Sequence, residues 1–136
     1  MIRVSQPSRP RSERPARPGP GTAFLRGFAF AGQGAWHAVR TQRNMRVHLA
    51  AAVAAVIAGA VLKISAVQWA CIALAIGMVL VAEIFNTVIE AMIDLQTQQF
   101  HPLAKIAKDG AAGAVLVASI TAIGVAVAVF LPRLLR

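Results

Sequence analysis

Three apolar stretches dominate the second half and middle of the chain. The first, residues 49–62, is shorter than the roughly 20 residues that a membrane-spanning helix needs, and it reaches that length only if the helix runs on to Ala66. The second covers residues 67–82, and the third covers residues 111–131 without a charge and ends at Pro132. These lengths predict three transmembrane helices, at residues 47–66, 67–95 and 110–132.

The chain before these stretches divides into two segments. Residues 1–22 carry five of the seven prolines, interleaved with five arginines. Such a segment cannot bury a core, and we expect a disordered basic tail. Residues 23–40 repeat apolar side chains such as Phe24 and Phe28 at three- and four-residue steps, which predicts an amphipathic helix. That helix either lies in the lipid headgroup layer or packs on the rest of the protein, and the sequence leaves both open.

Composition favours a membrane protein over a soluble one. Apolar residues make up 57% of the chain and charged residues 14%, and the mean hydropathy is +0.64. A net charge of +9 is typical of proteins that meet nucleic acids or anionic membranes. Because the chain has no Tyr and two Trp for stacking on bases, we expect anionic membrane lipids and no nucleic acid as partners. The predicted fold class is an all-α membrane protein, and the single cysteine excludes an intrachain disulfide.

The basic residues predict an orientation in the membrane. Eleven of the fourteen Lys and Arg lie up to Arg46 or in the connection at residues 95–109, whereas three lie near or beyond the opposite ends of the spans. By the positive-inside rule, the N-terminus and this connection face the cytoplasm. The short turn at residues 63–66 then faces outward. The sequence therefore predicts a multi-pass protein with its larger connection inside the cell.

Four of the five acidic residues fall within 27 positions of one another. On a helix, the polar side chains of the run at residues 83–94 share a sector of roughly 100°, while the other positions are apolar. They are Glu83, Asn86, Thr87, Glu90 and Asp94. An ionisable group at membrane depth is costly unless it is paired, and usually marks a functional site. The alternative is a solvated face on a helix that projects from the membrane.

Partners for these carboxylates follow in the connection and in the next helix: His101, Lys105, Lys108 and Asp109. Carboxylates beside Lys and His can hold a divalent metal and a polyphosphate, or they can form a proton relay in a small transporter. The chain has no Walker-type loop, no GxGxxG and no protein-kinase HRD or DFG motif. Spacing alone does not choose between these chemistries.

Four segments together resemble the small bacterial diacylglycerol kinase/undecaprenol kinase family, over about residues 24–132. They are TQRNMRVH (41–48), EIFNTVIE (83–90), HPLAK (101–105) and KDGAAGAV (108–115). The first and third are more similar to the undecaprenol kinases. The resemblance implies a homotrimer of three-helix subunits, each preceded by a surface helix, in the bacterial cell (inner) membrane. Its implied activity is the phosphorylation of a lipid alcohol by MgATP at a cytoplasmic site.

Undecaprenol is the acceptor that we expect from this resemblance, and diacylglycerol is the near alternative. From another class, a small proton-coupled transporter or a non-catalytic membrane protein stays open. Within the family pattern, Glu83 matches the general base and Glu90 a carboxylate that holds the metal, with Asp94 and Thr87 in supporting positions. The positions that match the nucleotide site are Arg26, Phe30, Asn86, Glu90, His101, Lys108 and Asp109.

The chain departs from the family pattern at Gln42. The family usually carries a Glu there, which helps to hold the metal. A Gln side-chain oxygen can coordinate a hard cation such as Mg²⁺, but it brings no charge. We therefore expect either weaker binding of Mg²⁺ or a site that depends more on Glu90 and on the phosphates of ATP.

Overall fold

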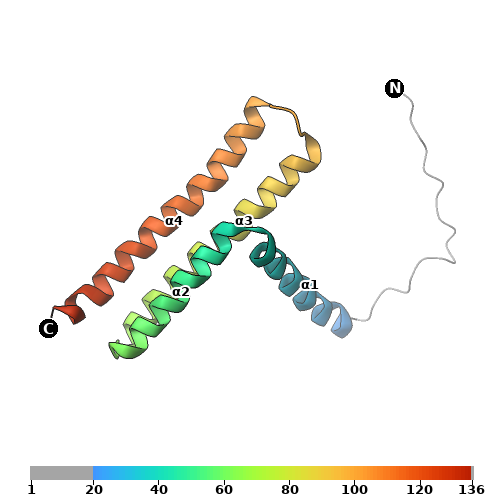
Figure 1. The fold of residues 1–136 in the computed structure, drawn as a ribbon. Coiled ribbons are helices and arrows are strands. Elements are labelled where there is room, and N and C mark those ends of the chain that lie inside the picture. The colour runs from blue at the N-terminus through green and yellow to red at the C-terminus, as the bar shows by residue number, and fades with distance from the viewer. Residues whose placement is uncertain (1–19, 136) are drawn as a thin grey trace, which may run out of the picture. The chain divides into compact units, whose positions relative to one another are not determined.

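The computed structural model describes residues 20–135, and within this range it consists of four helices without a strand. They are α1 (Pro20–Thr41), α2 (Arg43–Val61), α3 (Ala66–Gln96) and α4 (Pro102–Leu134), shown in Figure 1. The last three are each long and apolar enough to cross a membrane. The predicted all-α membrane fold is confirmed. Most of the predicted basic tail, residues 1–19, lies outside the described residues.

Helix α1 begins at Pro20, so the last residues of the segment predicted as a tail belong to the helix. A proline is tolerated in the first turn of a helix, because its missing N–H would have no partner there. The part of α1 up to Gln33 belongs to one compact unit, and the chain from Gly34 onward forms a second. In the first unit Phe24, Phe28 and Phe30 are exposed, and the rings of Phe24 and Phe28 meet edge to face with centroids 5.0 Å apart. Such an uncovered aromatic face fits either role predicted for this helix.

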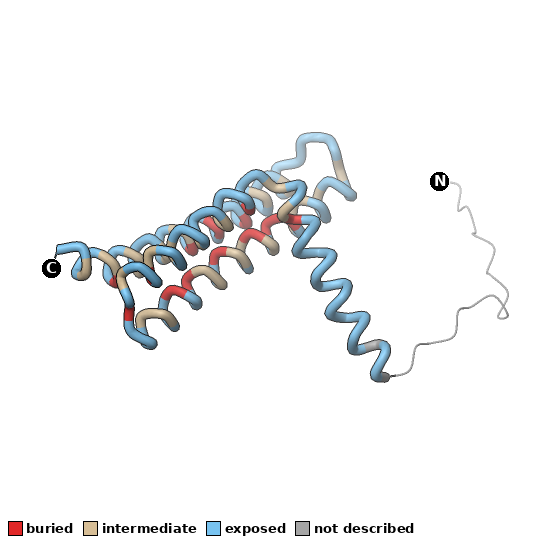
Figure 2. The backbone as a smooth tube through the Cα atoms, turned by 60° about the horizontal axis from the view of Figure 1, so that its bottom comes forward, coloured by how far each residue is buried: buried red, intermediate tan, exposed pale blue. Residues whose placement is uncertain are grey.

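In the second unit α2, α3 and α4 run beside one another in alternating directions (Figure 1). Helix α3 packs along α4, and α2 packs mainly on α3. Figure 2 shows that the buried residues form a line along α3, while much of the outer surface of the helices is exposed. The core at one end combines Ile64, Ile72 and Val129 with the partly buried Trp69. Exposed apolar side chains on the outer faces suit helices whose surroundings are lipid.

The turn between α2 and α3 lies close to the predicted residues 63–66, but the first span ends earlier than predicted. Helix α2 ends at Val61 and does not run on to Ala66. Lys63 takes a left-handed backbone conformation with φ of 49°, and the N–H of Ile64 donates to the carbonyl oxygen of Gly59 at 3.2 Å. Ser65 then starts α3 with a capping box that it shares with Gln68. Leu62 and Ile64 are apolar, so hydropathy does not fix the residue at which α2 ends, although Lys63 and Ser65 mark the turn itself.

Helix α4 is longer than the predicted span of residues 110–132 at both ends: it begins at Pro102, inside the predicted connection at residues 95–109, and it extends beyond residue 132. The helix continues through Pro132 to Leu134, so the prediction that Pro132 ends it is wrong. A proline so near the end of a helix costs little, because it removes one backbone hydrogen bond and few turns follow. In this extension the Arg133 guanidinium donates to the carbonyl oxygens of Leu62 and Lys63 at 2.8 and 2.7 Å, and to Gln68 Oε1 at 3.1 Å. Arg133 thereby joins α4 to the turn between α2 and α3.

Gly59 is the position where α2 and α3 approach each other most tightly among the described glycines. A Cβ at this position would lie 2.8 Å from an atom of the Trp69 ring and 3.0 Å from Ile64 Cδ1. We expect Gly59→Ala to destabilise the protein by about 1–3 kcal/mol, because the two helices must move apart. Thermal unfolding in detergent measures this effect.

Gly124→Ala is the matched control. Its added methyl group meets no atom within 4 Å, so it should leave stability unchanged or raise it by up to about 1 kcal/mol. Equal melting temperatures for the Gly59→Ala variant and the unmodified protein would contradict the close α2–α3 contact.

Candidate active site

The bundle-facing side of α3 changes from apolar to polar partway along the helix. Ile72, Ala75 and Val79 are buried at steps of three and four residues. The same steps lead next to Glu83 and Asn86, which are also buried, Glu83 with an exposed fraction of 1%. The predicted acidic stripe therefore begins inside the bundle. The alternative of a solvated face does not hold for its first members.

The depth of Glu83 follows from the length of α3. About 20 residues cross the hydrocarbon core of a bilayer, and counted from Ala66 they end near Phe85. Glu83 then lies at the far edge of the hydrocarbon. The remaining turns of α3, which carry Glu90 and Asp94, extend beyond it. A carboxylate at this level can meet a lipid from one side and a water-soluble molecule from the other.

Neither carboxylate oxygen of Glu83 has a hydrogen-bond partner among the described residues. Thr87 donates through Oγ1 to the backbone carbonyl of Glu83 at 2.9 Å, so its hydroxyl is occupied. His48 lines the same pocket as Glu83 and does not form a hydrogen bond with it. Buried polar atoms usually have hydrogen-bond partners, so two buried oxygens without a partner mark a place where a ligand can supply the missing hydrogen bond.

A pocket of about 300 Å³ adjoins this carboxylate. It is open to one side and combines polar and apolar walls from α2, α3 and α4. Its lining residues are Asn44, Val47, His48, Glu83, Asn86, Ala112, Val115, Leu116 and Ser119. The pocket thus brings together three segments that are far apart in the sequence.

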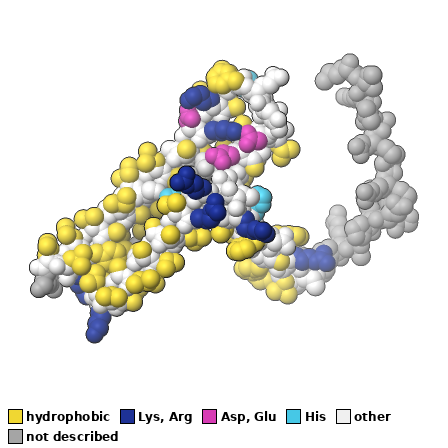
Figure 3. Space-filling model, viewed as in Figure 1, with side chains coloured by type: hydrophobic (Ala, Val, Ile, Leu, Met, Phe, Trp, Pro, Cys, Tyr) yellow, Lys and Arg dark blue, Asp and Glu magenta, His cyan; other side chains and the backbone are white. Residues whose placement is uncertain are grey.

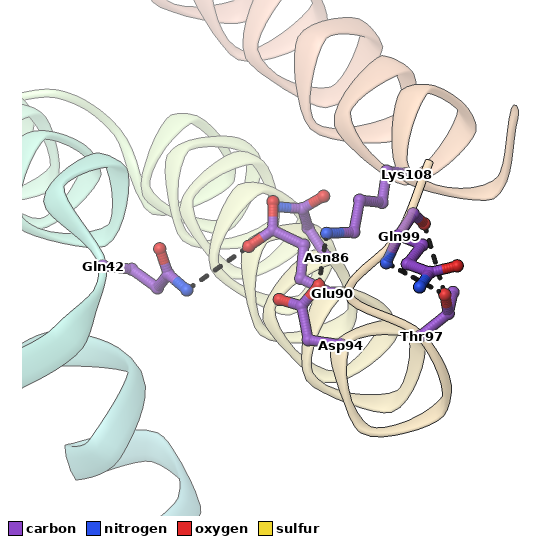
Figure 4. Close-up of polar contacts among 7 residues, drawn as sticks. All are labelled: Gln42, Asn86, Glu90, Asp94, Thr97, Gln99 and Lys108. Atoms are coloured by element: carbon purple, nitrogen blue, oxygen red, sulfur yellow. Dashed lines mark hydrogen bonds and ion pairs between the residues drawn. The ribbon is translucent and has the colours of Figure 1, made fainter. Parts of the chain in front are cut away.

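Glu90 lies two turns further along α3 and is held by two side-chain amides (Figure 4). Asn86 Nδ2 donates to Glu90 Oε1 at 3.2 Å, and Gln42 Nε2 donates to Glu90 Oε2 at 3.4 Å. Gln42 reaches this site because it occupies the N-cap position of α2. Asn86 Oδ1 is buried and has no partner among the described residues. The two amides therefore orient Glu90 while an oxygen acceptor beside it stays available.

Charged side chains gather where α3 meets the start of α4 (Figure 3). Lys108 Nζ bonds Asp94 Oδ1 at 2.5 Å across the two helices, and Lys105 pairs with Asp109 within α4. His101 accepts through Nδ1 from the N–H of Leu103 at 3.3 Å and caps α4. These ion pairs are exposed, and such pairs contribute at most about 1 kcal/mol to stability. Both lysines can exchange their partners for an incoming anion at small cost.

A second pocket of about 390 Å³ lies beside these charges. Its walls come from the end of α3, the connection at residues 97–101 and the first two turns of α4. The lining residues are Ile93, Asp94, Thr97, Gln98, Gln99, Phe100, His101, Ala104, Lys105, Lys108 and Asp109. Within it Thr97 Oγ1 and Gln99 bond each other and shape the connection (Figure 4).

The structure gathers most of the predicted site residues in two neighbouring groups. Gln42 and Asn86 both bond Glu90, and Glu83 lies one turn before Asn86 on α3. Asp94, His101, Lys108 and Asp109 line the second pocket. The hydroxyl of Thr87 bonds the backbone carbonyl of Glu83. Arg26 and Phe30 belong to the separately described N-terminal unit, so their approach to the nucleotide stays a prediction.

Three polar residues of the first pocket, Asn44, His48 and Ser119, were not among the predicted site residues. Asn44 and His48 belong to the polar start of α2, and Ser119 is a polar side chain in a largely apolar part of α4. The polarity of each residue was visible in the sequence, but it does not show which face of the helix the residue occupies. The structure places all three on the wall of the pocket of Glu83.

The donor set around Glu90 fits a magnesium ion that arrives with a nucleotide. Among the described residues no three side chains of Asp, Glu, His or Cys come together to form a metal cage. Mg²⁺ is commonly held by one or two carboxylates, with substrate phosphates and water as its other ligands. Glu90 supplies a carboxylate, and the side-chain amides of Asn86 and Gln42 donate to it through their nitrogens, while Asn86 Oδ1 has no partner among the described residues.

Comparisons with known proteins identify the family of this chain. The chain matches the prokaryotic diacylglycerol kinase family over residues 29–130. It is 44% identical to the undecaprenol kinase of Bacillus subtilis over 111 residues, which cover 82% of this chain and 90% of that protein. It is 43% identical to a diacylglycerol kinase of Synechocystis sp. over 113 residues, which cover 82% of this chain and 65% of that protein. With three membrane-spanning helices and a carboxylate site at their end, the chain belongs to the prokaryotic diacylglycerol kinase family of membrane lipid kinases.

Proposed function

We propose that this lipid kinase transfers the γ-phosphoryl group of ATP to the hydroxyl group of undecaprenol and releases undecaprenyl phosphate and ADP. The observation that carries the proposal is the buried carboxylate of Glu83, whose oxygens lack partners among the described residues at the edge of the hydrocarbon. At this depth the two carboxylate oxygens of Glu83 suit the hydroxyl group of a lipid, which can donate a hydrogen bond to one of them.

Glu83 acts as the general base in this proposal. The lipid hydroxyl donates its proton to a Glu83 oxygen while the hydroxyl oxygen bonds to the γ-phosphorus, and the bond from that phosphorus to the bridging oxygen of ADP breaks. Phosphoryl transfer requires little covalent help, so alignment and charge stabilisation dominate. The packing of Glu83 among α2, α3 and α4 provides this alignment.

The second pocket suits the phosphates and the adjoining parts of ATP. Lys108 exchanges Asp94 for a phosphate oxygen, and Lys105 and His101 add donors on the same wall. Glu90, Asn86 and Gln42 would hold Mg²⁺, which would neutralise charge on the phosphates of ATP. Asp109 keeps Lys105 in place through their ion pair.

The comparisons support undecaprenol as the acceptor more than diacylglycerol. The two relatives are nearly equal in identity, but the match covers 90% of the undecaprenol kinase and 65% of the diacylglycerol kinase. Both are kinases, so neither supports a proton-coupled transporter or a non-catalytic membrane protein.

The charge distribution supports a cytoplasmic site in the bacterial cell membrane. Arg43, Arg46 and Lys108 lie at the end of the bundle that carries the site, whereas Lys63 and Arg133 lie at the other end. We further propose a homotrimer, in which α1 lies on the membrane, brings Arg26 and Phe30 to the nucleotide and meets anionic lipids. Exposed apolar surface on the three long helices leaves room for contacts with other copies.

Glu83→Gln should lower the rate of lipid phosphorylation by about 10²- to 10⁴-fold, since the amide cannot take the proton of the hydroxyl. Transfer of radiolabelled phosphate from ATP to lipid in proteoliposomes measures this rate, with undecaprenol and diacylglycerol assayed in parallel. The melting temperature in detergent shows that the variant is folded. Activity within a few-fold of the unmodified protein would remove Glu83 as the base.

Gln42→Glu should lower the Mg²⁺ concentration for half-maximal activity by about 3- to 10-fold, because it adds a carboxylate beside Glu90. Activity as a function of Mg²⁺ at saturating ATP gives this value. Gln96→Glu, at the end of α3, adds the same charge outside the site and serves as the control. An unchanged Mg²⁺ dependence for Gln42→Glu would show that Gln42 does not lie near the metal.

Lys108→Met should raise the KM for ATP by about 10- to 100-fold, the value of one lost hydrogen bond to a charged group. Stability should change little, since the pair with Asp94 is exposed. Lys63→Met, at the opposite end of the bundle, should leave the KM for ATP unchanged. Steady-state kinetics at saturating lipid distinguishes the two variants, and equal KM values would contradict a phosphate-binding role for Lys108.

A further inference from the structure

An apolar cavity of about 290 Å³ lies between α2, α3 and α4, next to the pocket of Glu83. Small side chains make much of its wall, six of them alanines: Ala51, Ala52, Ala55, Ala75, Ala122 and Ala126. Its polar lining residues are His48 and Ser119, and the same two residues also line the pocket of Glu83. They therefore stand at the boundary between an apolar and a polar space.

The Ser119 hydroxyl is unusual for a membrane helix. Thr87 and Thr121 each donate to the backbone carbonyl four residues earlier, which is the common arrangement for such side chains. Ser119 does not, and its Oγ is buried without a partner among the described residues. A buried hydroxyl without a partner costs free energy, so a ligand that pairs with it gains in affinity.

His48 is the other polar side chain at this boundary. It is half-buried and makes no hydrogen bond to a described residue, and it lines the same pocket as Glu83. The orphaned atoms of Glu83, Asn86 and Ser119 face the same pocket from two further helices. Three helices thus direct unpaired polar groups to one place at the mouth of an apolar cavity.

We propose that His48 and Ser119 bind the hydroxyl end of the acceptor lipid and that the alanine-lined cavity holds the hydrocarbon next to that hydroxyl. This subsite rests on the proposed function. The lipid hydroxyl donates to Glu83, while a donor from Ser119 or His48 reaches its oxygen and keeps it oriented. The cavity is at the lower end of the roughly 300–1,000 Å³ of small-molecule sites, so it takes only the segment nearest the hydroxyl.

The lining favours an unsubstituted isoprenoid chain over a diacylglycerol. An isoprenoid alcohol presents only hydrocarbon to the alanines. A diacylglycerol brings two ester carbonyls close to its hydroxyl, and the cavity offers only His48 and Ser119 as side-chain donors. At least one carbonyl would be buried without a partner, which lowers affinity.

Steady-state kinetics with farnesol and 1,2-dioctanoylglycerol as dispersible acceptors tests the subsite. Ser119→Ala should raise the KM for farnesol by about 3- to 10-fold and leave the KM for ATP unchanged. Thr121→Ala, whose hydroxyl is exposed and already bonded to Val117, is the matched control and should change neither value. Unchanged KM values for farnesol in both Ser119→Ala and His48→Ala would overturn the role of these side chains.

Ala122→Leu tests the cavity itself. The larger side chain should fill the space and raise the KM for farnesol by about 10-fold or more, whereas Ala128→Leu on the exposed side of α4 should not. If Ala122→Leu instead changes the oligomeric state in native mass spectrometry and leaves the KM for farnesol unchanged, a second copy occupies the cavity and the proposal is wrong.

A binding measurement separates this inference from the proposed function. Farnesol should raise the melting temperature of the unmodified protein, and less so that of Ala122→Leu. Stabilisation of this kind without phosphate transfer to either alcohol would support the subsite and contradict the kinase reaction. Phosphate transfer to farnesol with the same KM in every variant would support the kinase reaction and contradict the subsite.

Discussion

The burial of one carboxylate at the edge of the hydrocarbon is the constraint on which this structure depends. Burying an ionisable group at such a depth costs several kcal/mol, and Glu83 has no hydrogen-bond partner among the described residues to offset that cost. The packing of α3 between α2 and α4 must therefore hold it in place. As a consequence, Glu83 stays available to accept a proton from a ligand. A carboxylate that was hydrogen-bonded within the protein would not be.

One end of the bundle carries contacts that fix the helices relative to one another, and the other end carries the polar site. At one end Arg133 bonds the carbonyl oxygens of the α2–α3 turn, and Gly59 lets Trp69 pack against α2. At the other end α2 contributes Gln42 and α4 contributes Lys108 to the polar stripe of α3. Because the helices are held in register at the first end, side chains up to 48 positions apart meet at the second. The same alignment of the three helices leaves Glu83 with the lipid on one side and the proposed nucleotide site on the other.

Periodicity and hydropathy are local properties, and the features that depend on them could be predicted. The three spans and the polar stripe from Glu83 to Asp94 are of this kind. The end of α2 at Val61 and the passage of α4 through Pro132 involve turn geometry and contacts of Arg133, which hydropathy and periodicity do not reveal. The hydrogen bond from Gln42 to Glu90 and the unpaired hydroxyl of Ser119 depend on how three helices pack. No single segment of the sequence shows which side chains this packing brings together.

Carbodiimide labelling with peptide mass spectrometry tests the central claim most directly, because it reports the surroundings of each carboxyl group. The account predicts that an apolar carbodiimide, dicyclohexylcarbodiimide, modifies Glu83 and that a lipid alcohol together with a nucleotide protects it. A water-soluble carbodiimide should instead modify the exposed Asp94 and Asp109 and leave Glu83 unmodified. Modification of Glu83 by the water-soluble reagent, or labelling by the apolar reagent that neither ligand reduces, would contradict a buried carboxylate that serves as the acceptor site.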